Sequence, residues 1–241
     1  MDILFFAVLI VIAFLYASIG HGGASGYLAL MALFSMDPIM MRSSALTLNL
    51  FVAGVAFISY YRGGFFKWKI LLPFIITSIP MAYLGAKMTI DPQLYKIILG
   101  VFLVIAVLRM LVIKPVSGRK AKEPVLLVGL IIGAGLGFIS GMIGIGGGII
   151  LSPILILLGW ANIKEAAAVS AIFIFLNSAS GLLGVPQSAF ISHPEIYVWI
   201  AIAFIGGMLG SLNGSFKFSN IRLQYILAFV LIMASFKLFV F

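Results

Sequence analysis

Long apolar stretches follow one another along this chain with little polar sequence between them, and this limits the possible folds more than any other feature. Most are about 17 to 21 residues long, enough for a helix to cross the hydrocarbon core of a bilayer. Hydrophobic residues make up 63% of the 241 positions and charged residues only 9%. We therefore predict an all-helical protein that crosses a membrane many times. The apolar stretches are 3–19, 24–36, 43–60, 68–88, 93–113, 125–142, 147–160, 165–184, 195–215 and 221–241.

The chain divides near its middle into two halves that resemble each other. Residues 19–24 align with residues 143–148, at an offset of 124 positions. Two later landmarks, Ser44-Ala45-Leu46 with its counterpart at 170–172 and 84–86 with its counterpart at 209–211, give offsets of 126 and 125. We predict a first repeat over 1–113, a basic cytoplasmic linker over 114–124 and a second repeat over 125–241.

The positive charges of the loops predict the orientation of these segments, because lysine and arginine favour the cytoplasmic side. Loops 61–69, 114–124 and 216–222 contain such residues and loop 185–195 contains none. This pattern fits five crossings in each half, which makes the repeats inverted, a common plan for secondary transporters. In the alternative, the short segments are re-entrant, which gives eight crossings and parallel halves.

Two glycine clusters, 20–26 and 141–148, lie at the start of the two shortest apolar stretches, 24–36 and 147–160. Glycine runs break helices, so we expect each short stretch to be a half-helix that begins at its cluster. The first turn of such a helix presents free N–H groups and the positive end of the helix dipole, which suits an anion. Two such ends converging in an inverted repeat would form one anion site.

Polar residues of the third segment in each half are candidates to complete this site, although hydrogen bonding between helices is an equal alternative. Asn49 and Asn177 align only approximately, because the offset of 126 places Asn49 opposite Phe175. The residues predicted to bind the substrate are Gly22, Gly23, Ala24, Ser25, Asn49, Gly146, Gly147, Gly148, Ser170 and Asn177. The glycines expected instead to pack helices together are Gly129, Gly133, Gly135 and Gly137.

The charged and titratable residues offer few other candidates. His21 lies inside the first cluster, where it either couples transport to protons or bonds to the backbone as a neutral side chain. Arg42, Lys87 and Arg109 lie near segment ends, where reaching to the membrane surface is favoured over neutralising a substrate charge. His193 lies in a predicted external loop, and each carboxylate falls near a segment end.

This composition argues against catalysis and against several other functions. The chain has two histidines and no cysteine, so an enzyme's nucleophile–base pair or metal site is not indicated, and neither is a cofactor. A phosphate-binding G-x-x-x-x-G-K-[ST] loop is missing from the sequence. The net charge of +9 is explained by membrane orientation rather than by nucleic-acid binding. The number of subunits is not set by any of these features.

The second cluster, Gly141 to Gly148 followed by Pro153, resembles the G-x-G-G-G…P signature of the sulfite exporter family, also called TauE/SafE or toluene sulfonate uptake permeases. The first half has a variant, with Ala29 where the proline would stand. The resemblance extends over the whole chain. It implies a multi-pass transporter of the bacterial inner membrane that moves sulfur-containing anions such as sulfite, sulfonates or sulfoacetate, often outward.

These observations together predict a secondary transporter that exports a small sulfur-containing anion by alternating access. An anion channel with the same site is one alternative, and a transporter of a non-sulfur carboxylate is another. The expected partners are the small anion and the lipid bilayer.

Overall fold

The computed structural model describes residues 3–112, 122–186, 195–214 and 221–240, without the side chains of 109–112 and 213–230. Within these ranges every regular element is a helix, so the predicted all-helical fold is confirmed. The helices are α1 (Ile3–Ser18), α2 (Ala24–Leu33), α3 (Pro38–Arg62), α4 (Trp68–Lys87), α5 (Pro92–Val112), α6 (Leu126–Ile143), α7 (Gly148–Leu157), α8 (Ile163–Gly184), α10 (Ile196–Gly214) and α11 (Ile221–Val240).

Four of the described helices, α3, α4, α6 and α8, are long and apolar enough to cross a membrane. The half-helices predicted at the glycine clusters are confirmed, since α2 and α7 have 10 residues each. At 1.5 Å per residue such a helix extends about 15 Å, roughly half the hydrocarbon core. The helical content and these long apolar helices agree with a polytopic membrane protein.

The helices that follow the two half-helices begin with side-chain caps. The Asp37 carboxylate accepts hydrogen bonds from the amides of Ile39 and Met40, and Pro38 is the first residue of α3. Asn162 and Glu165 form a reciprocal capping box at the start of α8. These caps satisfy amides that the helix itself leaves without partners, so the start of both long helices is fixed locally by the sequence.

Glycines hold α6 close against α4, as predicted for three of the four packing candidates. A β-carbon at Gly129, Gly133 or Gly137 would collide with Pro73, Phe74 or Ser78 respectively. Gly135 departs from the prediction, because a β-carbon there would meet no atom within 4 Å. Gly135 lies two residues from both Gly133 and Gly137 in the sequence, and it is on the exposed side of α6. The contact face therefore follows the helical period of α6.

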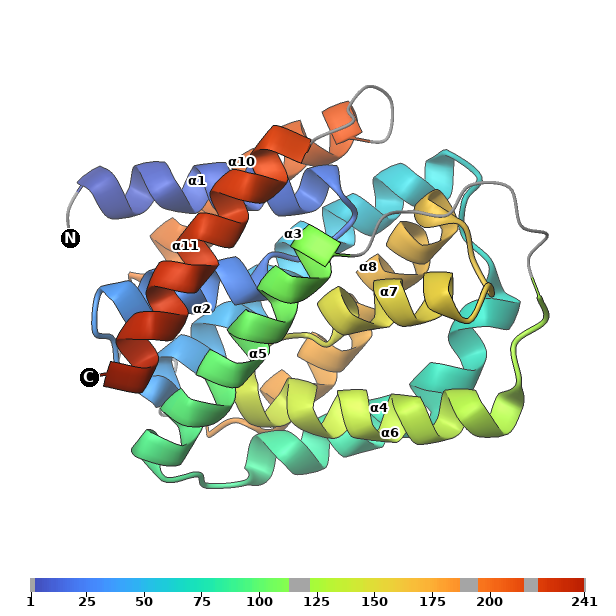
Figure 1. The fold of residues 1–241 in the computed structure, drawn as a ribbon, viewed down its shortest axis with the longest axis horizontal. Coiled ribbons are helices and arrows are strands. Elements are labelled where there is room, and N and C mark those ends of the chain that lie inside the picture. Colours follow the sequence, from blue (N-terminus) through green and yellow to red (C-terminus); the bar gives the residue numbers. More distant parts are fainter. Residues whose placement is uncertain (1–2, 113–121, 187–194, 215–220, 241) are drawn as a thin grey trace.

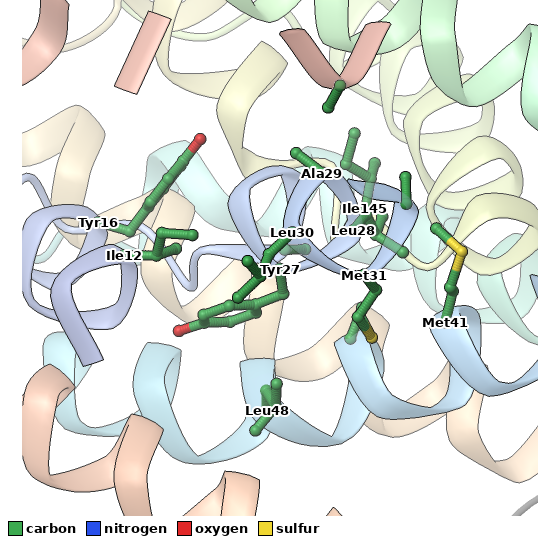
Figure 2. Packing of buried hydrophobic residues seen from close by; sticks show 14 of the residues in the cluster. Ile12, Tyr16, Tyr27, Leu28, Ala29, Leu30, Met31, Met41, Leu48 and Ile145 are labelled. Carbon is green, nitrogen blue, oxygen red and sulfur yellow. The ribbon is translucent and has the colours of Figure 1, made fainter. Parts of the chain in front are cut away.

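The two half-helices are enclosed by two sets of hydrophobic side chains, both of which contact Ile150. Residues 24–32 of α2 are all buried, and α1, α3, α5, α10 and α11 contribute to the cluster around them. Figure 2 shows Ile12 and Tyr16 of α1, Met41 and Leu48 of α3, and Ile145 of the second glycine cluster around α2. A second cluster surrounds α7 with residues of α4, α6 and α8. Each half-helix is thus held inside the protein.

Loops that are distant in the sequence contact one another at two opposite ends of the molecule (Figure 1). At one end the amide of Lys122 donates to the Gly159 carbonyl at 2.7 Å, and Lys67 forms an ion pair with Glu165. At the other end Lys237 donates to the Leu33 carbonyl at 2.6 Å. Most of the predicted linker and of loops 185–195 and 216–222 lies outside the described residues. The inverted repeat therefore stays a prediction.

Candidate functional site

The two half-helices begin near the middle of the molecule and run away from each other, α2 toward the left and α7 toward the right of Figure 1. The residues just before them, Gly23 and Gly147, have positive φ angles of 96° and 70°, which glycine adopts without strain. Neither α2 nor α7 has a side-chain cap, in contrast to α3 and α8. Two uncapped helix N-termini therefore start from the same central region.

The side-chain amide of Asn49 lies between the two glycine clusters. A β-carbon at Gly22 would lie 2.5 Å from Asn49 Oδ1, and one at Gly146 would lie 2.7 Å from Asn49 Nδ2. The Nδ2 group donates to Ser178 Oγ at 3.3 Å, whereas the buried Oδ1 has no hydrogen-bond partner. The Asn49 amide can therefore occupy its place between the two clusters only because Gly22 and Gly146 have no β-carbon.

Ile174 of α8 lies at the same centre and was missed by the sequence reasoning. Its side chain would collide with a β-carbon at Gly22, Gly146 or Gly148. The signal that would have found it is the offset of 125 positions, which places Ile174 opposite Asn49. The offset of 126 that holds at Ser44 leads instead to the neighbouring Phe175.

The central region is closed to solvent in this structure. Residues 20–32 and 143–149 are buried without exception. Asn49 is 0% exposed and Ile174 is 3% exposed. A small molecule bound here would be enclosed by protein, and it would have to displace the Asn49 or Ile174 side chain to gain room.

A chain of hydrogen bonds runs from the first cluster to α7 and α8. His21 Nδ1 lies 2.9 Å from the Ile19 carbonyl oxygen, and Nε2 lies 3.1 Å from Ser152 Oγ. Ser152 Oγ lies 2.7 Å from Ser170 Oγ and donates to it. Ser170 was a predicted site residue, whereas Ser152 was not. Because Ser152 lies one residue before Pro153, its position within the glycine–proline signature was the available signal.

The other predicted site residues are close to the clusters but contact neighbours of their own. Ser25 Oγ lies 2.6 Å from the Tyr16 hydroxyl, and Asn177 donates to the Phe173 carbonyl one turn back along its helix. A β-carbon at Gly23 would meet Tyr27, and one at Gly147 would meet Phe173. Ala24 is the buried first residue of α2. The structure thus brings Gly22, Gly146, Gly148 and Asn49 together around Ile174, and it directs Ser25 and Asn177 to other partners.

The basic residues separate into buried and exposed positions. Lys87 is exposed, with its ammonium over the Tyr83 ring, as expected near a helix end. Arg42 corrects the expectation of a surface position, because it is 8% exposed and its guanidinium donates to the carbonyls of Met88, just past the end of α4, and of Met142 in α6. The side chain of Arg109 and all of His193 lie outside the described part. Within that part, no three histidine, aspartate or glutamate residues are grouped as a metal site would require.

Comparisons with known proteins agree on one kind of protein. A sequence profile described as "Sulfite exporter TauE/SafE" matches residues 4–238. The chain is 34% identical over 235 residues to the probable membrane transporter protein y4hK of Sinorhizobium fredii, covering 95% of this chain and 94% of that protein. It is 34% identical over 146 residues to the probable membrane transporter protein MJ0441 of Methanocaldococcus jannaschii, covering 56% and 53% of the two chains. No solved structure gives a significant match.

Proposed function

Because the chain belongs to the sulfite exporter TauE/SafE family of membrane transporters, we propose that it exports a small sulfur-containing anion across the cell inner membrane. The anion, of the sulfite, sulfonate or sulfoacetate type, is held between the two glycine clusters. The observation that carries this proposal is the meeting of both clusters at the Asn49 amide, at the uncapped starts of α2 and α7.

The chemistry of this centre favours an anion over a cation or a neutral molecule. The positive ends of two helix dipoles point to it, and main-chain N–H groups at a helix start bind oxyanions without any charged side chain. The amide nitrogen of Asn49 has two N–H groups, of which one is directed to Ser178. The second N–H is available to an oxyanion beside Gly146.

The mechanism we propose is alternating access by two inverted halves. The contacts of Lys122 with Gly159 and of Lys67 with Glu165 support it, because they join loops that lie on one side only if α7 crosses. In the inverted arrangement the enclosed site described above corresponds to a state closed to both sides. Rocking of one half against the other would open the site to each side in turn.

His21 is the proposed point of coupling to protons. Since a carbonyl only accepts, Nδ1 carries a hydrogen toward Ile19. A neutral ring accepts at Nε2 from Ser152, whose single O–H is then not donated to Ser170. A protonated ring instead donates to Ser152, which then donates to Ser170. Protonation of His21 would therefore reverse a hydrogen-bond chain that links the first cluster to the second half.

Binding of a panel of anions to the purified protein tests the proposed site. The panel contains sulfite, sulfate, thiosulfate, sulfoacetate, taurine, acetate and chloride, and the readout is the rise in melting temperature caused by a ligand that prefers the folded state. We expect a sulfur-containing anion to stabilise the wild type and to lose this effect in Gly22→Ala, whose new β-carbon would collide with Asn49 and Ile174.

The matched control is Gly54→Ala on α3, where a β-carbon would make an ordinary contact at 3.5 Å with Phe175. An equal response of Gly22→Ala and wild type would refute the proposed position of the site. No response of the wild type to any anion would refute the proposal that the substrate is an anion. Stabilisation by acetate alone would favour the carboxylate alternative. Turnover in proteoliposomes and electrical recording across a bilayer then separate a transporter from an anion channel, because a channel gives unitary currents and a transporter does not.

A further inference from the structure

Arg42 is a buried cation near the start of α3. Its guanidinium donates to the Met88 carbonyl at 3.2 Å and to the Met142 carbonyl at 3.4 Å. These carbonyls lie just past the end of α4 and in the last turn of α6. Both bonds come from Nη1, and the Nε group is buried and has no hydrogen-bond partner. Two main-chain contacts therefore leave both the net charge and one N–H group of Arg42 unsatisfied.

No carboxylate neutralises this charge within the described residues. The ion pair recorded there joins Lys67 to Glu165, which lie at the opposite end of α3 and at the start of α8. Asp37, one turn before Arg42, uses its carboxylate to cap α3. The nearby Tyr95 donates its hydroxyl to the Ile143 carbonyl at 2.9 Å. A buried charge with no counter-ion is costly to a protein, so this position favours an anion from outside the chain as its partner.

Arg42 is also positioned beside the second glycine cluster. A β-carbon at Gly144 would lie 3.1 Å from Arg42 Cγ, and Gly144 has a positive φ of 88°. Arg42 and Asn49 are seven residues apart on α3, which is about two helical turns or roughly 10 Å on one face. This face of α3 therefore lies along the second glycine cluster, with Arg42 next to Gly144 and Asn49 next to Gly146.

A cleft of about 390 Å³ opens at this end of the molecule, beside the C-terminal end of α2. Its lining includes Asp37, Pro38 and Met41 at the start of α3, together with Lys96 and Lys237. Met41 precedes Arg42 directly. Two lysines and one aspartate give the cleft a net positive lining at the end of the molecule where Arg42 lies, although Arg42 itself does not line it.

We propose that Arg42 is the fixed positive charge that binds the substrate anion between this cleft and the centre at Asn49. This inference rests on the proposed function and adds the residue that selects for charge. A guanidinium suits this role, since it stays protonated and its planar N–H groups match oxyanion geometry. The competing explanation is that Arg42 only caps the C-terminal ends of α4 and α6.

The test compares Arg42→Gln and Arg42→Lys with Tyr95→Phe in the full-length protein. Tyr95→Phe removes a neighbouring side-chain donor from the same end of α6 without changing any charge. The probes are the sodium salts of the anion panel above, titrated by calorimetry against protein that elutes as one folded species. We expect Arg42→Gln to weaken binding at least about tenfold, the effect of losing one charged hydrogen bond.

Arg42→Lys keeps the charge and should weaken binding less, and Tyr95→Phe should bind as the wild type does. If Arg42→Gln does not fold, the comparison of Arg42→Lys with Tyr95→Phe decides, because only the former alters the anion's partner. Equal affinity in Arg42→Lys, Tyr95→Phe and wild type, or an equal loss in Arg42→Gln and Tyr95→Phe, would overturn the inference. Normal binding by Arg42→Gln with loss in Gly22→Ala would overturn it and leave the proposed function intact.

Discussion

The amide nitrogen of Asn49 on α3 lies 3.3 Å from the hydroxyl oxygen of Ser178 on α8. This hydrogen bond joins the two longest described helices at the depth where both glycine clusters meet, and it fixes the plane of the amide between Gly22 and Gly146. The same side chain therefore couples the two halves and borders the proposed anion site. Its two tasks can be separated by substitution.

Asn49→Leu should abolish anion binding while the protein still folds. Leucine has nearly the shape of asparagine but no N–H group, and a neutral buried hydrogen bond contributes only about 1 kcal/mol to stability. The measurement is the anion-induced rise in melting temperature. Ser178→Ala is the control, because it removes the same hydrogen bond but leaves the amide in place. Binding retained by Asn49→Leu, or lost equally in Ser178→Ala, would show that the amide is only a link between helices.

Gly137→Ala should destabilise the protein, because its β-carbon would collide with the Ser78 carbonyl on α4. Overpacking of this kind costs about 1 to 3 kcal/mol. Gly135→Ala on the same helix should leave stability unchanged or raise it by about 0.5 to 1 kcal/mol, since its β-carbon meets no atom and alanine favours a helix. Reversible unfolding in detergent micelles measures the difference, and equal stabilities for the two variants would contradict the close packing of α4 on α6.

The sequence was sufficient to predict the parts of this fold that depend on local backbone chemistry. Runs of neighbouring glycines favour a break in a helix, so the starts of α2 and α7 followed from the residues themselves. The packing face of α6 was predictable because small residues at helical spacing permit close approach. Gly135 was wrongly included because spacing by two was treated like spacing by four, although a helix turns these residues to different faces.

The residues that the sequence did not reveal are those that depend on which helix lies opposite. Arg42 is one turn from a helix start, which normally means a position at the membrane surface. It is buried because the ends of α4 and α6 converge on it, and their carbonyls accept its hydrogen bonds. Ile174 has no chemistry of its own, and only its contact with the glycines places it at the centre.

His21→Gln should remove the dependence of anion affinity on pH while keeping the affinity at high pH. Glutamine still forms a hydrogen bond to Ser152 but does not titrate, whereas an imidazole gains a positive charge as the pH falls from 8 to 5. Wild-type affinity should therefore rise over this range. Binding of a sulfonate whose own charge is constant between these pH values gives the measurement. A pH dependence shared by both proteins would assign the coupling to another group.

Cysteines placed in this cysteine-free chain distinguish inverted from parallel halves. Lys122→Cys and Lys164→Cys replace exposed residues next to the contact of Lys122 with Gly159. The inverted arrangement places both on the cytoplasmic side, whereas parallel halves with eight crossings place Lys164 outside. Ser117 and Ser188, beyond the described residues, should fall inside and outside respectively.

We expect an impermeant thiol reagent added to intact cells to label Ser188→Cys, and to label Lys122→Cys, Lys164→Cys and Ser117→Cys only after the membrane is permeabilised. The reason is that α7 must cross for the start of α8 to lie beside the linker, as the 2.7 Å hydrogen bond between Lys122 and Gly159 requires. Labelling of Lys164→Cys from outside would exclude the inverted plan. Alternating access would then need a different pair of moving parts.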